Sequence, residues 1–250
     1  MGVEHPAQVL VYSLGRGDVY LTSQLHPDGA DPYERPRYGL GQAARYVQLS
    51  PTTLRSWVVG RPYRTSEGSR YSPPLIIRPN PEDPRLSFSN LREAHVLRSL
   101  RTKHEVPMSA VRAALDYAAD ELNIKRLLLS RELMADAGSL FVERLGQLID
   151  LSRSGQIALK EMLDGHLSRI QWEPLRLFPV VAARGLAGPQ IVSIDPKVSF
   201  GRPFIVGKGV RTATIVDRLD AGEDREAVAA DYQLDDLEVD EAILYERAAA

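Results

Sequence analysis

Two short amphipathic segments joined by a tight turn constrain the fold of this chain more than any other feature. The first segment places apolar residues at the i, i+3, i+4 and i+7 positions of one helical face, namely Leu40, Ala43, Ala44 and Val47. After the turn, Ser50 is a favoured N-cap and Pro51 a favoured first helical residue. Leu54, Trp57 and Val58 then give a second helix its inward face. Two short helices joined by about three residues form the helix-turn-helix pattern.

The net charge of −2 conceals a strong asymmetry along the chain. Between Arg35 and Arg78 there are eight arginines and one acidic residue, which gives +7. Residues 211–250 hold four arginines and twelve acidic residues, which gives −8. A polyanion is attracted to the first stretch and repelled by the last. Either stretch is compatible with an ordinary solvated surface, but the basic one coincides with the helix-turn-helix pattern, and together they favour DNA binding.

The exposed faces of the two predicted helices carry side chains suited to DNA. Arginine can donate two hydrogen bonds to one guanine, and Ser and Thr can bond phosphates or bases. An Arg-rich stretch follows directly and suits a wing that contacts the DNA backbone. The residues predicted to bind DNA are Arg45, Thr52, Thr53, Arg55, Ser56, Arg61, Arg64, Arg70 and Tyr71.

The glycines of the stretch FGRPFIVGKGVRTATIVDRL, residues 200–219, invite comparison with a phosphate-binding loop. A Walker loop needs four residues between its glycines and a hydroxyl residue after its lysine. Here Gly201 and Gly207 are separated by five residues, and Lys208 is followed by Gly209. The spacing excludes a Walker loop and predicts a strand, a glycine turn and a helix from about Thr212.

Other patterns typical of enzymes are also missing from the sequence. Cysteine is absent, and no two of the five histidines have the spacing of a zinc-binding helix. The glycine motifs of hydrolases and of dinucleotide-binding enzymes do not occur. We therefore expect no enzymatic activity, no cofactor and no metal site. We also expect a cytoplasmic protein without a membrane span, because there is no secretory signal and no run of about 18 apolar residues.

Composition and periodicity predict an α+β chain with four regions. Residues 1–37 are expected to form a flexible arm with one candidate strand, Val9–Leu14, and residues 38–123 a winged helix-turn-helix DNA-binding domain. Residues 124–189 are expected to form a β-rich linking region. Residues 190–250 are expected to form a strand hairpin plus three helices.

Finer assignments follow from local patterns in the second region. Leu75–Arg78 and Leu86–Phe88 are candidate strands of a hairpin, and two stronger helices are expected from about Asn90 and Ser109.

In the linking region, three short apolar runs bounded by Gly, Ser and Asp are predicted as strands: RLLL (126–129), LFVERL (140–145) and LIDL (148–151). A helix is expected over 155–167, followed by extended segments at 169–172 and 175–178. Near the C-terminus, Asp224 is a candidate helix cap, and Asp235 with Glu238 has the spacing of a capping box.

The first part of the chain resembles the DNA-binding domain of MerR-type regulators. The resemblance rests on GLGQAARYVQLSPTTLRSWV (39–58), on the Arg-rich stretch after it, and on FSNLREAHVLRSLRTKHEVPMSAVRAAL (88–115). It covers about 85 residues and implies a helix-turn-helix, a wing and a second helix pair. The sequence departs from the family in lacking a long dimerisation helix and an effector-site cysteine, so a metal-sensing role is not supported.

The last part of the chain, residues 190–245, resembles a small family of bacterial antitoxins. The landmarks of that family are an Ile-Asp-Pro, a Gly-x-Pro, a Gly turn and a closing helix, and they fall on Asp195, Pro196, Gly201, Pro203, Gly207, Gly222, Tyr232 and Leu234. The turn departs from the family pattern Gly-Thr-Arg. It reads Gly-Lys-Gly here, and the arginine is displaced to Arg211.

Together the two parts resemble the longer VapB-like antitoxins. That resemblance implies a PIN-like, VapC-like ribonuclease toxin as partner and a complex that represses its own promoter. A homodimer is expected, because two half-sites about 10 base pairs apart need a two-fold symmetric reader. The residues expected to contact the toxin are Arg184, Arg202, Lys208 and Arg211.

A second hypothesis is a stand-alone MerR-like transcriptional regulator that senses a small molecule. In that hypothesis the β-rich region forms the ligand pocket and Trp172 is one of its walls. A packed core position is the simpler interpretation of Trp172.

Overall fold

The computed structural model describes residues 31–66, 68–102, 106–124, 126–134, 136–150 and 152–248. The candidate strand Val9–Leu14 and most of the expected arm lie outside these residues. The first described elements are α1 (Leu40–Tyr46), α2 (Pro51–Val58), β1 (Arg61–Thr65), β2 (Gly68–Ser72), α3 (Phe88–Thr102) and α4 (Met108–Asp120). Next come η1 (Leu127–Leu129), η2 (Arg131–Met134), α5 (Asp136–Leu148), α6 (Arg153–Leu167), β3 (Ile170–Trp172) and β4 (Leu175–Leu177). The last are β5 (Val192–Ser193), η3 (Ser199–Gly201), β6 (Phe204–Ile205), α7 (Thr212–Asp220), α8 (Arg225–Tyr232) and α9 (Asp236–Ala248).

The helix-turn-helix pattern folds as α1 and α2. The predicted cap is confirmed: the Ser50 hydroxyl accepts a hydrogen bond of 3.2 Å from the Thr53 amide, and Pro51 is the first helical residue. Leu54, Trp57 and Val58 are buried on the inward face of α2, as the spacing predicts. The apolar spacing thus fixes which face of α2 remains outside.

The predicted hairpin of Leu75–Arg78 with Leu86–Phe88 is wrong. The amides of Leu75 and Ile76 both donate to the Trp57 carbonyl, at 2.7 and 3.0 Å. Leu86 instead forms an isolated bridge with Tyr38. Both segments therefore pair with the region around α1 and α2, and the hairpin of this region is β1–β2.

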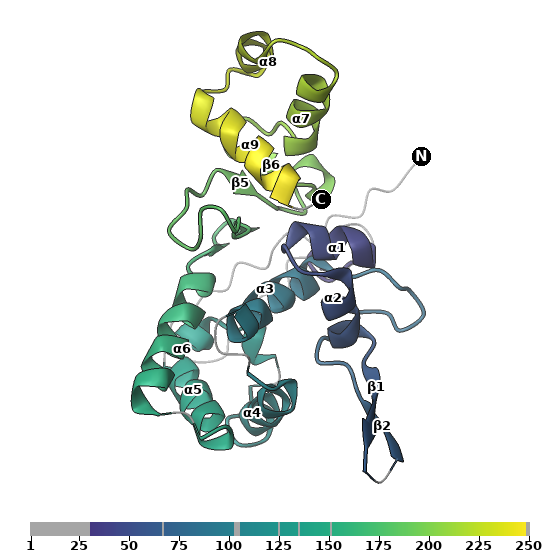
Figure 1. Cartoon of the computed structure of the whole chain (residues 1–250), viewed down its shortest axis with the longest axis vertical. Helices are drawn as coiled ribbons and strands as arrows, with labels where there is room; N and C mark the ends of the chain where they lie inside the picture. Colours follow the sequence, from purple (N-terminus) through teal and green to yellow (C-terminus); the bar gives the residue numbers. More distant parts are fainter. Residues whose placement is uncertain are drawn as a thin grey trace, which may run out of the picture.

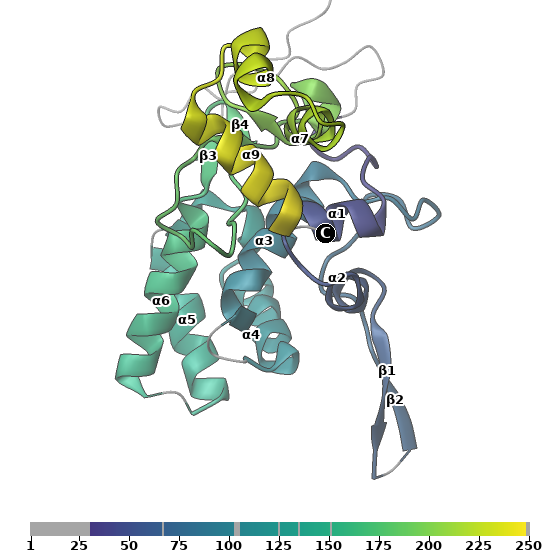
Figure 2. The same ribbon diagram turned by 45° about the horizontal axis from the view of Figure 1, so that its top comes forward.

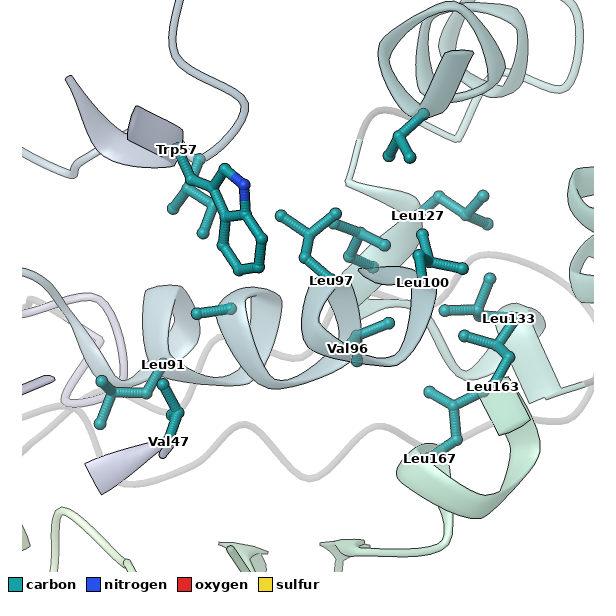
Figure 3. Packing of buried hydrophobic residues seen from close by; sticks show 14 of the residues in the cluster. Val47, Trp57, Leu91, Val96, Leu97, Leu100, Leu127, Leu133, Leu163 and Leu167 are labelled. Atoms are coloured by element: carbon teal, nitrogen blue, oxygen red, sulfur yellow. The ribbon is translucent and has the colours of Figure 1, made fainter. Parts of the chain in front are cut away.

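Helix α3 runs through the centre of the main core and is surrounded by side chains from the other elements (Figure 3). It begins at Phe88, two residues before the expected start, because Ser87 and Asn90 exchange two hydrogen bonds of 3.1 and 3.2 Å. Leu97 and Leu100 are fully buried, and Leu163 of α6 packs into the same cluster. One hydrophobic core therefore extends from the helix-turn-helix region to α6.

The predicted β-rich linking region is wrong, because most of it is helical. The run LFVERL lies in α5, and the run LIDL begins at the last residue of this helix, Leu148. Leu133 of η2, three residues of α5 (Ala137, Phe141 and Leu145) and Ile149 just after α5 recur every four residues and face the core. The run RLLL lies in the 3-10 helix η1. Helix α6 and the β3–β4 hairpin form as predicted, with Ile170 opposite Leu177.

Two buried histidines lie where α3 meets α6. The rings of His95 and His166 have centroids 5.1 Å apart, and the His95 Nε2 lies 3.0 Å from the His166 carbonyl. Burial lowers the pKa of His166 to about 4 and lowers the pKa of His95 well below its ordinary value. Both rings are therefore neutral in the folded chain near pH 7.

The C-terminal module, residues 192–248, has a core of its own. Its buried side chains include Ile205, Ile215, Val239 and Tyr245. The strand, Gly turn and helix from Thr212 form as predicted: β6 is followed by two glycines with positive φ and then by α7. The predicted caps of α8 and α9 are confirmed, with Asp224 accepting from Ala227 and Asp235 and Glu238 exchanging bonds of 2.9 and 2.7 Å.

Helix α9 connects the C-terminal module to α1, and Figures 1 and 2 both show the C-terminal end of α9 next to α1. The fully buried Tyr245 donates its hydroxyl to the Tyr46 carbonyl at 3.2 Å. Glu246 forms an ion pair with Arg45 and accepts a hydrogen bond of 2.5 Å from the Thr212 hydroxyl. The module is therefore fixed against the helix-turn-helix rather than connected by a loose chain.

Candidate nucleic-acid interface

The outward face of α2 presents a threonine and an arginine. Thr52, Arg55 and Val59 lie three or four residues apart, on the side opposite the buried Leu54 and Trp57, and all three are exposed. Arg55 makes no hydrogen bond or ion pair with another of the described residues. Its five donors are therefore available to an external acceptor.

Thr53 and Ser56 have local roles in the same helix. The Thr53 side chain accepts a hydrogen bond of 2.8 Å from the Ser50 hydroxyl, and the Ser56 hydroxyl donates to the Thr53 carbonyl at 2.7 Å. These two side chains stabilise the first turn of α2. They thereby hold Thr52 and Arg55 in a fixed position on the outward face of α2.

The β1–β2 hairpin projects away from the rest of the molecule and is seen along its length in both views (Figures 1 and 2). An antiparallel pair usually buries one of its faces. Here the described side chains of both strands are exposed, apart from a partly buried Ser72. A two-stranded hairpin without a buried face gains little stability by itself, so both of its faces are open to a partner.

The strand register sorts the hairpin side chains onto two faces. Tyr63 lies opposite Arg70 and on the same face as Arg61, whereas Arg64 and Tyr71 lie on the other face. Each face therefore combines arginine with an aromatic ring. Tyr63 was not among the predicted DNA-binding residues. A strand over 61–65 would have placed it on the face opposite Arg64, beside Arg61.

The base of the hairpin is fixed to the end of α2. The Tyr71 hydroxyl donates to the Val59 carbonyl. Gly60 has a φ of +81°, and a Cβ there would lie 2.4 Å from the Ser72 carbonyl oxygen, so only glycine fits this corner. The arginines of the hairpin and Arg55 of α2 are therefore held on one connected surface, which we call the basic arm (residues 51–72).

Arg45 is placed apart from the basic arm. It lies on α1, and its guanidinium pairs with Glu246, whose side chain is only 8% exposed. An arginine that balances a nearly buried carboxylate is part of the joint with α9. The structure thus groups Arg45 with the C-terminal module rather than with the other predicted DNA-binding residues.

The four residues expected to contact a toxin also separate into two groups. Arg184 pairs with the buried Glu241 at 2.7 Å, and the Lys208 ammonium donates to the Gln233 carbonyl, so both have internal partners. Arg202 is exposed, and Arg211 lies over the Phe200 ring at 5.7 Å. Arg202 and Arg211 line a polar groove of about 510 Å³ beside α7.

Trp172 belongs to the packed part of the molecule. Arg92 and Arg131 lie over its ring at 4.7 and 5.2 Å, and its indole N–H points to the Met134 sulfur at 3.4 Å. A separate cavity of about 360 Å³ lies between the segment after β2 and α4, where Leu75, Ile77 and Arg112 contribute to its walls. Trp172 does not line that cavity.

Across the described residues, no helix is long and apolar enough to span a membrane. Within the same residues, no group of three or more His, Cys, Asp or Glu side chains is arranged to hold a metal ion. The basic arm offers a different chemistry, with four arginines on α2 and the hairpin. It can donate many hydrogen bonds to a polyanion over a length of several residues.

Two family models match separate parts of the chain. The family described as "Putative DNA-binding HTH domain" matches residues 36–115, which include the basic arm. The family described as "Protein of unknown function (DUF433)" matches residues 192–245, within the C-terminal module.

Two proteins of Mycobacterium tuberculosis strain H37Rv are similar over most of the chain. The "Uncharacterized protein Rv2308" is 26% identical over 238 residues, covering 92% of this chain and 94% of that protein. A crystal structure of Rv2018 from the same species shares the fold, with a TM-score of 0.58 at 23% identity, covering 84% of this chain and 99% of that one. The "Putative antitoxin VapB45" is 30% identical over 217 residues, covering 80% of this chain and 89% of that protein. The chain therefore belongs to the family of this VapB45 protein.

Proposed function

We propose that the chain is the antitoxin of a type II toxin–antitoxin pair. In this proposal it binds its own operator DNA as a repressor, neutralises a PIN-like, VapC-like ribonuclease and acts in the cytoplasm. The observation that carries the DNA-binding part is the basic arm, which has exposed arginines on a hairpin that buries neither face. Its relationship to a protein named as an antitoxin supports the rest.

The basic arm suits a winged helix-turn-helix of the MerR type. A major groove admits an α-helix, and the exposed Arg55 in the last turn of α2 can donate two hydrogen bonds to one guanine. Arg61, Arg64 and Arg70 on the hairpin then act as the wing and contact phosphates on either side. A homodimer would place two basic arms on successive half-sites about one helical turn apart.

The C-terminal module suits the toxin. PIN-like nucleases hold metal ions with a cluster of carboxylates, and an arginine can form two parallel hydrogen bonds with a carboxylate. Arg202 is exposed and Arg211 is partly exposed, and neither has an internal ion pair like that of Arg184 or a backbone partner like that of Lys208. The module also has its own core, so it can present these side chains from a fixed surface.

Two measurements test the proposal. First, fluorescence anisotropy with the duplex upstream of the chain's own reading frame should show salt-dependent binding. If the four arginines of each basic arm neutralise four phosphates, the slope of log K against log salt is about −3.6 per protomer. Second, the purified chain should suppress the RNase activity of the protein encoded beside it. Binding without salt dependence, or unchanged RNase activity, would contradict the proposal.

A ligand-responsive, stand-alone regulator is the second candidate, and the cavity beside α4 favours it. Arg112, which lines that cavity, donates to the Pro74 carbonyl at 3.2 Å, on the segment that continues from the hairpin. A small molecule there would act directly on the connection to the basic arm. A change in DNA affinity caused by a small molecule, without any protein partner, would support this candidate over the antitoxin.

A further inference from the structure

The most exposed large apolar side chain among the described residues is Phe200, which is 81% exposed. It lies in the short loop η3, between β5 and β6 of the C-terminal module. Its backbone is left-handed, with φ 58° and ψ 33°, and its neighbours Ser199 and Gly201 also have positive φ, of 47° and 72°. A left-handed conformation is unfavourable for residues with a Cβ, and it is rare for an aromatic residue.

The surrounding contacts hold this loop in place. The Ser199 hydroxyl donates to the Gly209 carbonyl at 2.7 Å, and the Arg37 guanidinium donates to the Pro196 carbonyl at 2.8 Å. A Cβ at Gly201 would lie 2.4 Å from the Tyr38 hydroxyl oxygen, so the loop is packed closely against the helix-turn-helix region. The exposed ring is therefore a fixed feature and not the tip of a loose loop.

Neither folding nor solubility explains a phenylalanine at this position. The ring is not part of the C-terminal core, and glycine would adopt the same backbone without strain. Strained backbone is retained mainly where it serves binding or catalysis. The ring therefore needs an explanation outside the free chain.

Positive charge lies beside the ring. The Arg211 guanidinium is over the ring at 5.7 Å, and Arg202 is exposed two residues away. Residues 211–250 carry a net charge of −8, which opposes a nucleic acid extending across this module. Two arginines beside an exposed ring, on a module that is otherwise acidic, are instead complementary to a protein surface that carries carboxylates opposite them.

We propose that Phe200 is the anchor of a protein-docking surface, with Arg202 and Arg211 at its rim. The surface takes a protein partner that offers an apolar pocket bordered by carboxylates. Buried aromatic and arginine side chains at the centre of an interface contribute most of the binding energy in many complexes. The inference rests on the proposed function, in which that partner is the nuclease encoded beside this chain.

The test compares three variants by calorimetry against the purified nuclease and, separately, against the operator duplex. Phe200→Gly removes the ring and relieves the backbone, so its melting temperature should be at least that of the wild type. Phe200→Tyr keeps the ring. Leu237→Ala, at an exposed apolar position of α9, is the matched control.

Phe200→Gly should weaken nuclease binding by about 30-fold or more, whereas Phe200→Tyr and Leu237→Ala should stay within about threefold of the wild type. DNA affinity should be the same in all four proteins. Equal nuclease affinity for Phe200→Gly and the wild type would overturn the inference alone, as would a loss of DNA binding instead. A wild-type chain that does not bind the nuclease would overturn the inference and the proposed toxin partner together.

Discussion

The basic arm and the C-terminal module differ in how many of their side chains are buried or paired internally. In the arm, the described side chains of the hairpin are nearly all exposed, and Arg55 of α2 has no partner among the described residues. The module buries a core and pairs many of its charges internally, as Arg218 does with Glu223 and Asp231 at 2.5 and 2.7 Å. The comparison teaches that the arm leaves its arginines available to an external acceptor, whereas the module uses most of its apolar and charged side chains for internal contacts.

The largest expected difference between the two regions comes from the same substitution made in each. Tyr245→Ala removes a fully buried ring of the module, so the free energy of unfolding should fall by about 3–5 kcal/mol. Tyr71→Ala removes a 58% exposed ring of the arm and should cost less than about 1 kcal/mol. Urea denaturation measures both. Similar losses would show that the arm is part of the structural core.

The main core should lose stability at acid pH because His166 is buried in its neutral form. Its pKa of about 4 lies below the value of about 6.5 in an unfolded chain, so the unfolded state binds more protons between these values. Stability should therefore fall by about 3 kcal/mol from this residue as the pH falls from 7 to 4. His166→Asn cannot titrate, and denaturation at both pH values should show a correspondingly smaller loss. Identical pH dependence in the two proteins would contradict the assignment.

A single arginine of the wing should have a smaller effect than these. Arg64→Ala should weaken binding to any DNA sequence by a similar factor and reduce the salt slope by about 1, because it removes one phosphate contact. Arg64→Lys should restore most of the slope, since lysine also binds phosphate as a point charge. An unchanged salt slope in Arg64→Ala would show that this face of the hairpin does not contact the DNA.

The smallest effect is expected at Arg45, which connects the two regions. Arg45 is nearly half exposed, and the nearly buried Glu246 keeps its hydrogen bond from the Thr212 hydroxyl, so Arg45→Ala should cost about 1 kcal/mol of stability. DNA affinity should change by less than about twofold. A double-mutant cycle with Glu246→Gln would measure the coupling free energy of the pair. A large loss of DNA affinity in Arg45→Ala would show that Arg45 contacts the DNA.

Local patterns in the sequence predicted the elements whose signals are local. The cap at Ser50, the capping box at Asp235 and Glu238, and the turn after β6 all depend on residues within a few positions of each other. The strands expected in 126–151 failed because short apolar runs were taken without their four-residue repeat, which continues from Leu133 to Ile149.

Tertiary partners account for what the sequence did not predict. Nothing near Arg45 or Arg184 indicates that each pairs with a buried glutamate of α9, about 200 and 57 residues away. The exposure of Phe200 also depends on the close packing of its loop against Tyr38. Charge patterning could locate the basic arm, but only the fold separates arginines that face outward from those that hold the structure together.

The central claim is that DNA binds to the basic arm and not to the C-terminal module. The most direct measurement compares two exposed arginines by anisotropy titration of the operator duplex at about 50 and 200 mM salt. Arg55→Ala should weaken binding by about 5- to 150-fold, the value of one base contact. Arg247→Ala, at a 70% exposed side chain of α9, should stay within about twofold of the wild type. Equal losses in both variants, or a loss only in Arg247→Ala, would contradict the account.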